Sequence, residues 1–229
     1  MEQYKNKFLN KKIVLFAPGP TLNEYIKIDD NEYMTAGVNG VIIHPEFQNL
    51  DLYFWAGDLD TKKHPTPSEK PIRENLSKLK QNCLKFTNTT INKKDKHPIF
   101  GETQITENEA KRLGFETYDI AFGKSYESDE TWHLDLKKGF DACSIILAAC
   151  QWLLFMGFSE IVLVGCDCTS KHSYEHLISN DKCDWHLNQL VERWSLFKNY
   201  VEKHFKTKIY VINPKGLKDI FEIYEKDTK

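Results

Sequence analysis

The run Glu160–Val164 (EIVLV) carries the clearest structural signal in this sequence. An almost uninterrupted series of apolar residues is typical of a parallel strand covered on both faces, because a strand with one face in water alternates apolar with polar residues. Lys12–Phe16 (KIVLF) has the same character, and a glycine follows each run, at Gly19 and at Gly165. We therefore expect two buried strands of a parallel sheet.

Helical segments alternate with the predicted strands. Ser144–Phe158 is apolar almost all round and has a glycine near its end, which predicts a buried helix. From Asp184 or Trp185 to Phe205, apolar residues recur at three- and four-residue spacing, which predicts an amphipathic helix. Further strands are expected at Met34–Ile43, at Leu50–Ala56 and at Lys208–Ile212, the last of the chain. This alternation favours an α/β fold with a Rossmann-like, doubly wound and mostly parallel sheet.

Residues 61–135 show a weaker pattern, with several prolines and only short apolar runs, at Cys83–Phe86 and Tyr118–Phe122. A stretch of this kind predicts irregular structure with short strands. A chain of 229 residues fits one domain. We therefore expect a single Rossmann-like domain over residues 1–229, with an insertion at about 61–135.

The charge and hydropathy of the sequence argue against nucleic acid and membrane partners. The formal net charge is −2, and no large cluster of Lys and Arg stands out, so we expect no nucleic acid partner. No apolar run is long enough to span a bilayer and the first residues do not resemble a signal peptide, which predicts no transmembrane segment and a cytoplasmic location. The sequence leaves a homo-oligomer open.

The turn after the first predicted strand, A-P-G-P-T-L, is a candidate phosphate-binding loop. Gly19 would let the backbone approach a ligand, Pro20 suits the first position of a helix, and Thr21 offers a hydroxyl. A plain tight turn explains the same residues. Asp167, which follows the strand Glu160–Val164, can accept sugar hydroxyls or cap a turn.

Two sets of residues are candidate metal ligands. Asp58 and Asp60 follow a predicted strand, where alternate carboxylates can hold magnesium or manganese, although solvated loop carboxylates give the same pattern. Cys166 and Cys168, with nearby cysteine and histidine residues, could bind zinc. The cysteines lack the paired C-x-x-C spacing of a structural zinc site, so the spacing does not favour one.

Histidines are candidates for proton transfer, since only imidazole titrates near neutral pH without a large perturbation. His172 and His176 lie in the segment after the strand Glu160–Val164, and His186 lies at the start of the predicted amphipathic helix. Surface or structural histidines would give the same pattern.

Three stretches together resemble known families. They are A-P-G-P-T-L, then S-I-I-L-A-A-C-Q-W-L-L-F-M-G-F-S-E-I-V-L-V-G-C-D, and finally F-K-T-K-I-Y-V-I-N-P-K-G-L. They cover about half of the chain. They are similar to the bacterial lipooligosaccharide sialyltransferases of glycosyltransferase family 42, and to the Rossmann-like proteins grouped with 6-hydroxymethylpterin diphosphokinase.

The resemblance to the sialyltransferases implies a role for individual residues. It implies a nucleotide donor contacted by the first loop and by the ends of two further strands, and a histidine base before the helix that leads to the strand Lys208–Ile212. The residues that it assigns to the donor are Gly19, Pro20, Thr21, Asn39, Asp167, Thr169 and Tyr174, and the base is His186.

These observations predict a nucleotide-sugar-dependent glycosyltransferase that acts in surface polysaccharide or glycoconjugate assembly. The donor would be CMP- or UDP-linked, and the acceptor a glycan or a small molecule. Two other functions remain open. One is an ATP-dependent pterin-type diphosphokinase with magnesium on Asp58 and Asp60, and the other is a non-catalytic nucleotide-binding module.

Overall fold

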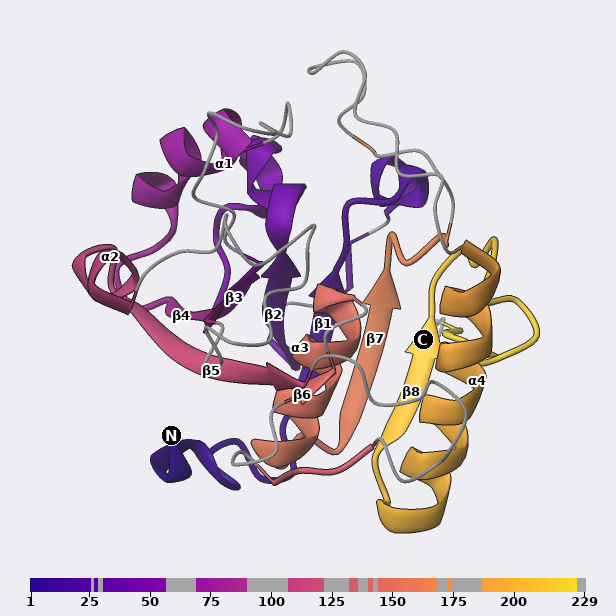
Figure 1. Ribbon diagram of the computed structural model, residues 1–229. Coiled ribbons are helices and arrows are strands. Elements are labelled where there is room, and N and C mark those ends of the chain that lie inside the picture. Colours follow the sequence, from indigo (N-terminus) through magenta and orange to yellow (C-terminus); the bar gives the residue numbers. More distant parts are fainter. Residues whose placement is uncertain are drawn as a thin grey trace.

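The protein is an α/β molecule built on one parallel sheet (Figure 1). The computed structural model describes residues 1–25, 27–28, 31–56, 69–89, 107–121, 132–135, 140–141, 144–168, 173 and 187–225. Within these ranges nine strands form the sheet, in the order β6-β5-β4-β3-β2-β1-β7-β8-β9, and each neighbouring pair is parallel. The doubly wound α/β fold expected from the sequence is confirmed.

The strands are β1 Lys12–Phe16, β2 Tyr33–Val38, β3 Leu52–Trp55, β4 Leu84–Thr89, β5 Phe115–Ala121, β6 Phe140–Asp141, β7 Glu160–Val164, β8 Lys208–Val211 and β9 Glu222–Ile223. The α-helices are α1 Glu69–Asn75, α2 Glu107–Arg112, α3 Ile145–Phe155 and α4 Leu187–His204. Short 3-10 helices are η1 Glu2–Tyr4, η2 Pro20–Glu24, η3 Asn39–Ile43, η4 Pro45–Phe47 and η5 Leu76–Lys78.

Both faces of the sheet are buried. On β1, Ile13 and Leu15 pack on the side of α3 and α4, whereas Val14 and Phe16 pack on the side of η2, η3 and α1. Alternate side chains of a strand point to opposite faces, so an apolar residue at every position requires cover on both. In Figure 1, α3 crosses in front of the sheet and α4 runs along β8.

Helix α3 is the centre of one core. Trp152 packs against Phe86 and Tyr118, with ring centroids 5.0 and 5.6 Å apart. The helix is followed by Gly157, whose φ of +85° is the left-handed conformation that commonly ends a helix. Among the described residues, no helix is long and apolar enough to cross a membrane.

The strands predicted at Lys12–Phe16 and Glu160–Val164 are confirmed with the same bounds, as β1 and β7. The strand predicted at Leu50–Ala56 is present as β3, which is shorter. The buried helix predicted within Ser144–Phe158 is α3, and the described part of the amphipathic helix is α4.

The second strand of the chain ends earlier than the sequence predicts. Met34–Ile43 was expected to be one strand, but β2 ends at Val38 and Asn39–Ile43 forms the 3-10 helix η3. Asn39 has a φ of +44°, a left-handed conformation that Asn tolerates better than most residues and that lies outside the φ range of a regular strand. Val41 and Ile42 are fully buried in η3. The apolar residues that predicted a longer strand therefore belong to the core as part of a 3-10 helix.

The sheet also continues beyond the strand expected to be its last. Lys208–Ile212 corresponds to β8, but β9 then pairs with it in parallel, Glu222 opposite Tyr210 and Ile223 opposite Val211. Both residues of β9 are exposed, so the strand lacks the apolar pattern that marks buried strands.

The described residues within 61–135 extend the sheet. The short strands expected at Cys83–Phe86 and Tyr118–Phe122 are present as β4 and β5, and both are longer than expected. Strand β4 pairs with β3 and with β5, so these residues belong to the same sheet as β1. The single domain with an insertion stays a prediction.

Candidate functional site

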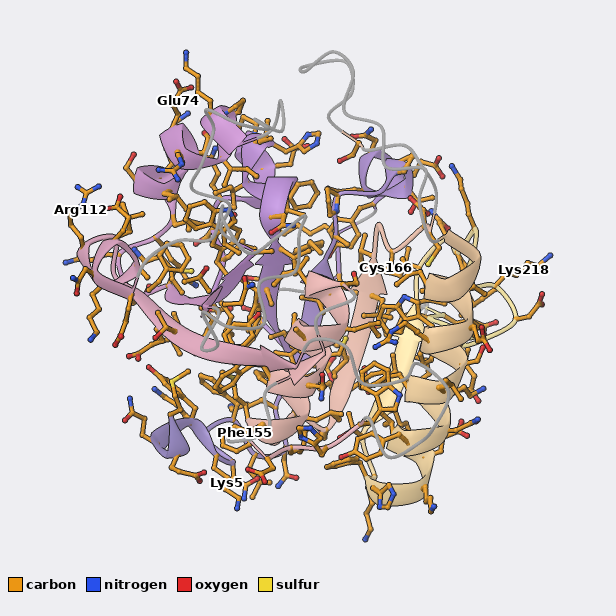
Figure 2. The ribbon with its side chains drawn as sticks, viewed as in Figure 1. Lys5, Glu74, Arg112, Phe155, Cys166 and Lys218 are labelled. Carbon is orange, nitrogen blue, oxygen red and sulfur yellow. The ribbon has the colours of Figure 1, made fainter. Side chains whose placement is uncertain are left out.

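The carboxyl ends of β1 and β7 meet in the middle of the sheet. The chain moves outward from β1 to β6, crosses back to β7 and then moves outward to β9, so the strand order reverses between β1 and β7. In open α/β sheets, ligands bind outside the carboxyl ends of the strands at such a point. Cys166 marks this edge in Figure 2, whereas Lys5 and Phe155 lie near the opposite edge.

Backbone hydrogen bonds join the two loops at this edge. Phe16 is opposite Val164 in the register, and beyond this pair the N–H of Ala17 donates to the carbonyl of Val164 at 2.8 Å. The N–H of Gly19 donates to the carbonyl of Gly165, also at 2.8 Å. The loops therefore continue the pairing of β1 and β7 past the ends of the strands.

Two glycines make this approach possible. A Cβ at Gly19 would lie 2.2 Å from the carbonyl oxygen of Gly165 and 2.5 Å from Oδ2 of Asp167. A Cβ at Gly165, which has a φ of +69°, would lie 2.1 Å from the carbonyl oxygen of Ala17. Gly19 is thus needed for contact between two parts of the protein, and the approach to a ligand expected from the sequence stays a prediction.

The side chain of Asp167 holds the start of η2. Its Oδ2 accepts a hydrogen bond from the N–H of Thr21, and its Oδ1 accepts one from the Thr21 hydroxyl, both at 2.7 Å. Both residues are 2% exposed. The first N–H groups of a helix have no partner within the helix, so a carboxylate from the loop after β7 caps η2 across the edge of the sheet.

The N–H groups of the first loop are consequently used within the protein. The four donors of Ala17–Leu22, where two of the six residues are prolines without an N–H, pair with Val164 O, Gly165 O, Asp167 Oδ2 and Gly19 O. A phosphate cradle made of these N–H groups does not fit this arrangement. Gly19, Pro20 and Thr21 shape the edge, and their contact with a ligand stays a prediction.

Asp167 also fastens the loop after β8. Its backbone carbonyl accepts a hydrogen bond from the N–H of Gly216 at 3.0 Å. A Cβ at Gly216 would lie 2.8 Å from that same carbonyl oxygen. One residue therefore links the ends of three neighbouring strands, β1, β7 and β8.

Asn39 plays a similar part at the ends of β2 and β3. Its backbone carbonyl accepts from the Tyr53 hydroxyl at 2.8 Å, and its Oδ1 accepts from the N–H of Ala56 at 2.9 Å. The side-chain amide nitrogen, Nδ2, has no hydrogen-bond partner among the residues that the structure describes. Asn39 is thus held by its two acceptors, and within the described ranges its two amide N–H donors are unpaired.

Sequence reasoning missed a buried pair at this edge, His44 and Ser173. His44 Nε2 and Ser173 Oγ lie 3.0 Å apart, and the residues are 5% and 2% exposed. The only sequence signal was the position of His44 soon after the second predicted strand. In the sequence, Ser173 lies between His172 and Tyr174, two of the predicted site residues.

Several predicted site residues lie outside the described part of the chain, and their roles stay predictions. These residues are the histidines His172, His176 and His186, the predicted donor contacts Thr169 and Tyr174, and the predicted metal ligands Asp58 and Asp60. Among the described residues, no group of three or more His, Cys, Asp and Glu side chains could hold a metal ion.

Cys166 and Cys168 flank Asp167 in the sequence, and Cys166 is buried whereas Cys168 is half-buried. Burial raises the pKa of Cys168 to about 12, and the neighbouring carboxylate adds to the effect. Burial also raises the pKa of Cys166 well above its usual value. Zinc binds thiolates, so zinc binding at either cysteine would have to remove a proton against this raised pKa.

Comparison with known proteins relates this fold to sialyltransferases. No model of a protein family matches the chain, and no curated protein matches it. The chain is similar to the sialyltransferase CstII from Campylobacter jejuni in complex with the substrate analogue CMP-3FNeuAc, with a TM-score of 0.50. The two are 17% identical over 94% of this chain and 86% of that one.

Two variants of the sialyltransferase CST-II, each in complex with CMP, give TM-scores of 0.52 and 0.53. Both are 17% identical to this chain and match 94% of it, covering 86% and 87% of their own chains. At this identity the similarity shows a shared fold. The resemblance to pterin diphosphokinases finds no support in these comparisons.

We predict that Thr21→Val destabilises the protein without any ligand. Valine has the shape of threonine but no hydroxyl, so Oδ1 of the buried Asp167 would lose its donor. The free energy of unfolding, measured by urea denaturation, should fall by about 1.5–3 kcal/mol. Thr21→Ser keeps the hydroxyl and should cost less than about 1 kcal/mol. A valine variant as stable as the wild type would contradict this structural role.

Proposed function

We propose that the protein is a nucleotide-sugar-dependent glycosyltransferase. It transfers a sugar from a CMP- or UDP-linked donor to a glycan or small-molecule acceptor, in the assembly of surface polysaccharide or glycoconjugate. The shared fold with sialyltransferases in complex with CMP and CMP-3FNeuAc supports this class and favours the CMP-linked donor.

The observation that carries the proposal is the geometry of Asn39. Its backbone and Oδ1 are held by Tyr53 and Ala56, and no described residue pairs with its two amide donors at the carboxyl end of β2, next to β1. A nucleotide offers many acceptor oxygens and ring nitrogens to such donors. Because Asn39 is fixed before a ligand arrives, binding would cost little ordering entropy.

The proposed reaction needs a base at the same edge. The acceptor oxygen attacks the anomeric carbon of the donor sugar while its proton passes to His186, and the bond from that carbon to the phosphate oxygen breaks. His172 and His176 are the alternative bases. The proposed donor contacts after β7 are Thr169, Tyr174 and Asp167. The role of Asp167 is to fix the first loop through its two hydrogen bonds to Thr21.

A divalent cation remains part of the proposal. Magnesium or manganese on Asp58 and Asp60 would neutralise charge on the leaving phosphate when bound. The residues follow β3, whose carboxyl end lies at the proposed donor edge.

We predict that the wild-type protein hydrolyses or transfers sugar from a CMP-linked donor, and less readily from a UDP-linked donor. The assay follows release of labelled sugar, with ATP and a pterin acceptor as a separate arm. Full activity in chelator would remove the cation from the proposal. Nucleotide binding without any turnover would favour a non-catalytic module, and pyrophosphate transfer from ATP would favour the diphosphokinase.

Asn39→Asp tests the observation that carries the proposal. Aspartate keeps an acceptor for the N–H of Ala56 and tolerates the left-handed backbone, but it lacks both amide donors. The KM for the donor should rise at least tenfold with little change in melting temperature. Asn213→Asp is the matched control, because Asn213 has a φ of +46° at the end of β8, is exposed and would gain the same charge. Equal effects of the two substitutions would show that charge alone is responsible.

His186→Ala tests the proposed base. A positioned base contributes about 10² to 10⁴ in rate, so kcat should fall at least a hundredfold while donor affinity stays nearly unchanged. The measurement is steady-state kinetics together with calorimetric binding of CMP. Wild-type kcat in this variant would transfer the role to His172 or His176, which the same substitution then tests.

A further inference from the structure

The buried pair His44 and Ser173 joins two segments that leave the sheet on either side of β1. His44 follows η3, which begins where β2 ends, and Ser173 follows β7 in the chain. Strands β2 and β7 are the two neighbours of β1. The hydrogen bond between Nε2 and Oγ, at 3.0 Å, therefore spans the end of β1.

Ser173 is fastened on the side of β1 as well. Its N–H donates to the carbonyl of Pro18 at 2.7 Å, and its own carbonyl accepts from the side-chain amide of Asn23 at 3.1 Å. The N–H, the carbonyl and the hydroxyl of Ser173 are thus all hydrogen-bonded, and the residue is 2% exposed. Ser173 is thus held at the end of β1 by its backbone and its hydroxyl, and in the sequence it lies between Thr169 and Tyr174, the predicted donor contacts after β7.

His44 is fixed on the opposite side. Its N–H donates to the carbonyl of Val41 at 3.2 Å, its carbonyl accepts from the N–H of Phe47 at 3.1 Å, and its ring meets the Phe47 ring edge to face. The 3-10 helix η3 joins His44 directly to Asn39. With a rise of about 2 Å per residue, the two lie about 10 Å apart along one short rigid element.

We propose that His44 is a positioning residue for the nucleotide donor. Its hydrogen bond to Ser173 sets the distance between the segment that presents Asn39 and the segment after β7. This inference rests on the proposed function, since it assigns a role toward the same donor. His44 is assigned no contact with the donor or the reacting atoms, since both members of the pair are buried.

The test is to remove the hydrogen bond from either side and to restore it. His44→Leu and Ser173→Ala each abolish it, whereas His44→Gln keeps a side-chain nitrogen near the position of Nε2. The readouts are the dissociation constant for CMP by calorimetry, and the KM for the donor and kcat by steady-state kinetics. We expect both deletions to raise the dissociation constant and KM about tenfold, with kcat changed less than twofold.

Two further results are expected of a pair that acts as a unit. The double variant His44→Leu with Ser173→Ala should be no worse than His44→Leu alone, because Ser173→Ala then has no hydrogen bond to the imidazole left to remove. His44→Gln should recover most of the donor affinity, which a merely structural role for the imidazole ring would not give.

Thr207→Val is the matched control. The Thr207 hydroxyl donates to the carbonyl of Phe158 at 2.8 Å, next to the amino end of β8 and far from the proposed site. This substitution also removes a hydroxyl hydrogen bond and should lower the melting temperature without changing KM. A rise in KM equal to that of Ser173→Ala would overturn the proposal, since lost stability alone would then explain both.

The outcomes separate this inference from the proposed function. A wild-type protein that neither binds nor turns over any nucleotide sugar refutes both. An active wild type together with an unchanged KM in Ser173→Ala refutes the positioning role alone. Ser173→Ala deletes a single oxygen atom, so it decides the matter even where His44→Leu fails to fold.

Discussion

The carboxylate of Asp167 is the contact on which the shape of the sheet's central edge depends. It is almost completely buried and accepts two hydrogen bonds from Thr21, both at 2.7 Å. A buried carboxylate without donors costs several kcal/mol, so the two loops cannot separate unless Asp167 also leaves the interior. Gly19 and Gly165 allow the loops to come close enough for this contact, because any side chain at either position would overlap the opposite backbone.

Burial of the parallel sheet on both faces explains which strand ends could be predicted from the sequence and which could not. Strands β1 and β7 are buried on both faces and therefore consist of apolar runs whose ends can be located in the sequence. The end of β2 could not be located in this way, because Val41 and Ile42 are as fully buried in η3 as they would be in a strand. What ends β2 is the left-handed backbone of Asn39, which apolar periodicity does not reveal.

The candidate site could be predicted in part. Parallel strands bring their carboxyl ends to one edge, so Thr21, Asn39 and Asp167 were expected there, and that is where the structure has them. Their pairing was not predictable, since Thr21 was expected to offer its hydroxyl to a ligand and instead donates it to Asp167. His44 and Ser173 are 129 positions apart, and a contact over that separation leaves no trace in local sequence pattern.

The distance along the chain between Thr21 and Asp167, 146 positions, has a consequence for how the protein is made. While the ribosome synthesises the chain, β1 lacks its β7 neighbour until most of the sequence has emerged. An apolar strand with one unpaired edge invites pairing with other chains, and pairings between distant segments form slowly. The edge that carries the candidate site can therefore close only after β7 and Asp167 have been synthesised.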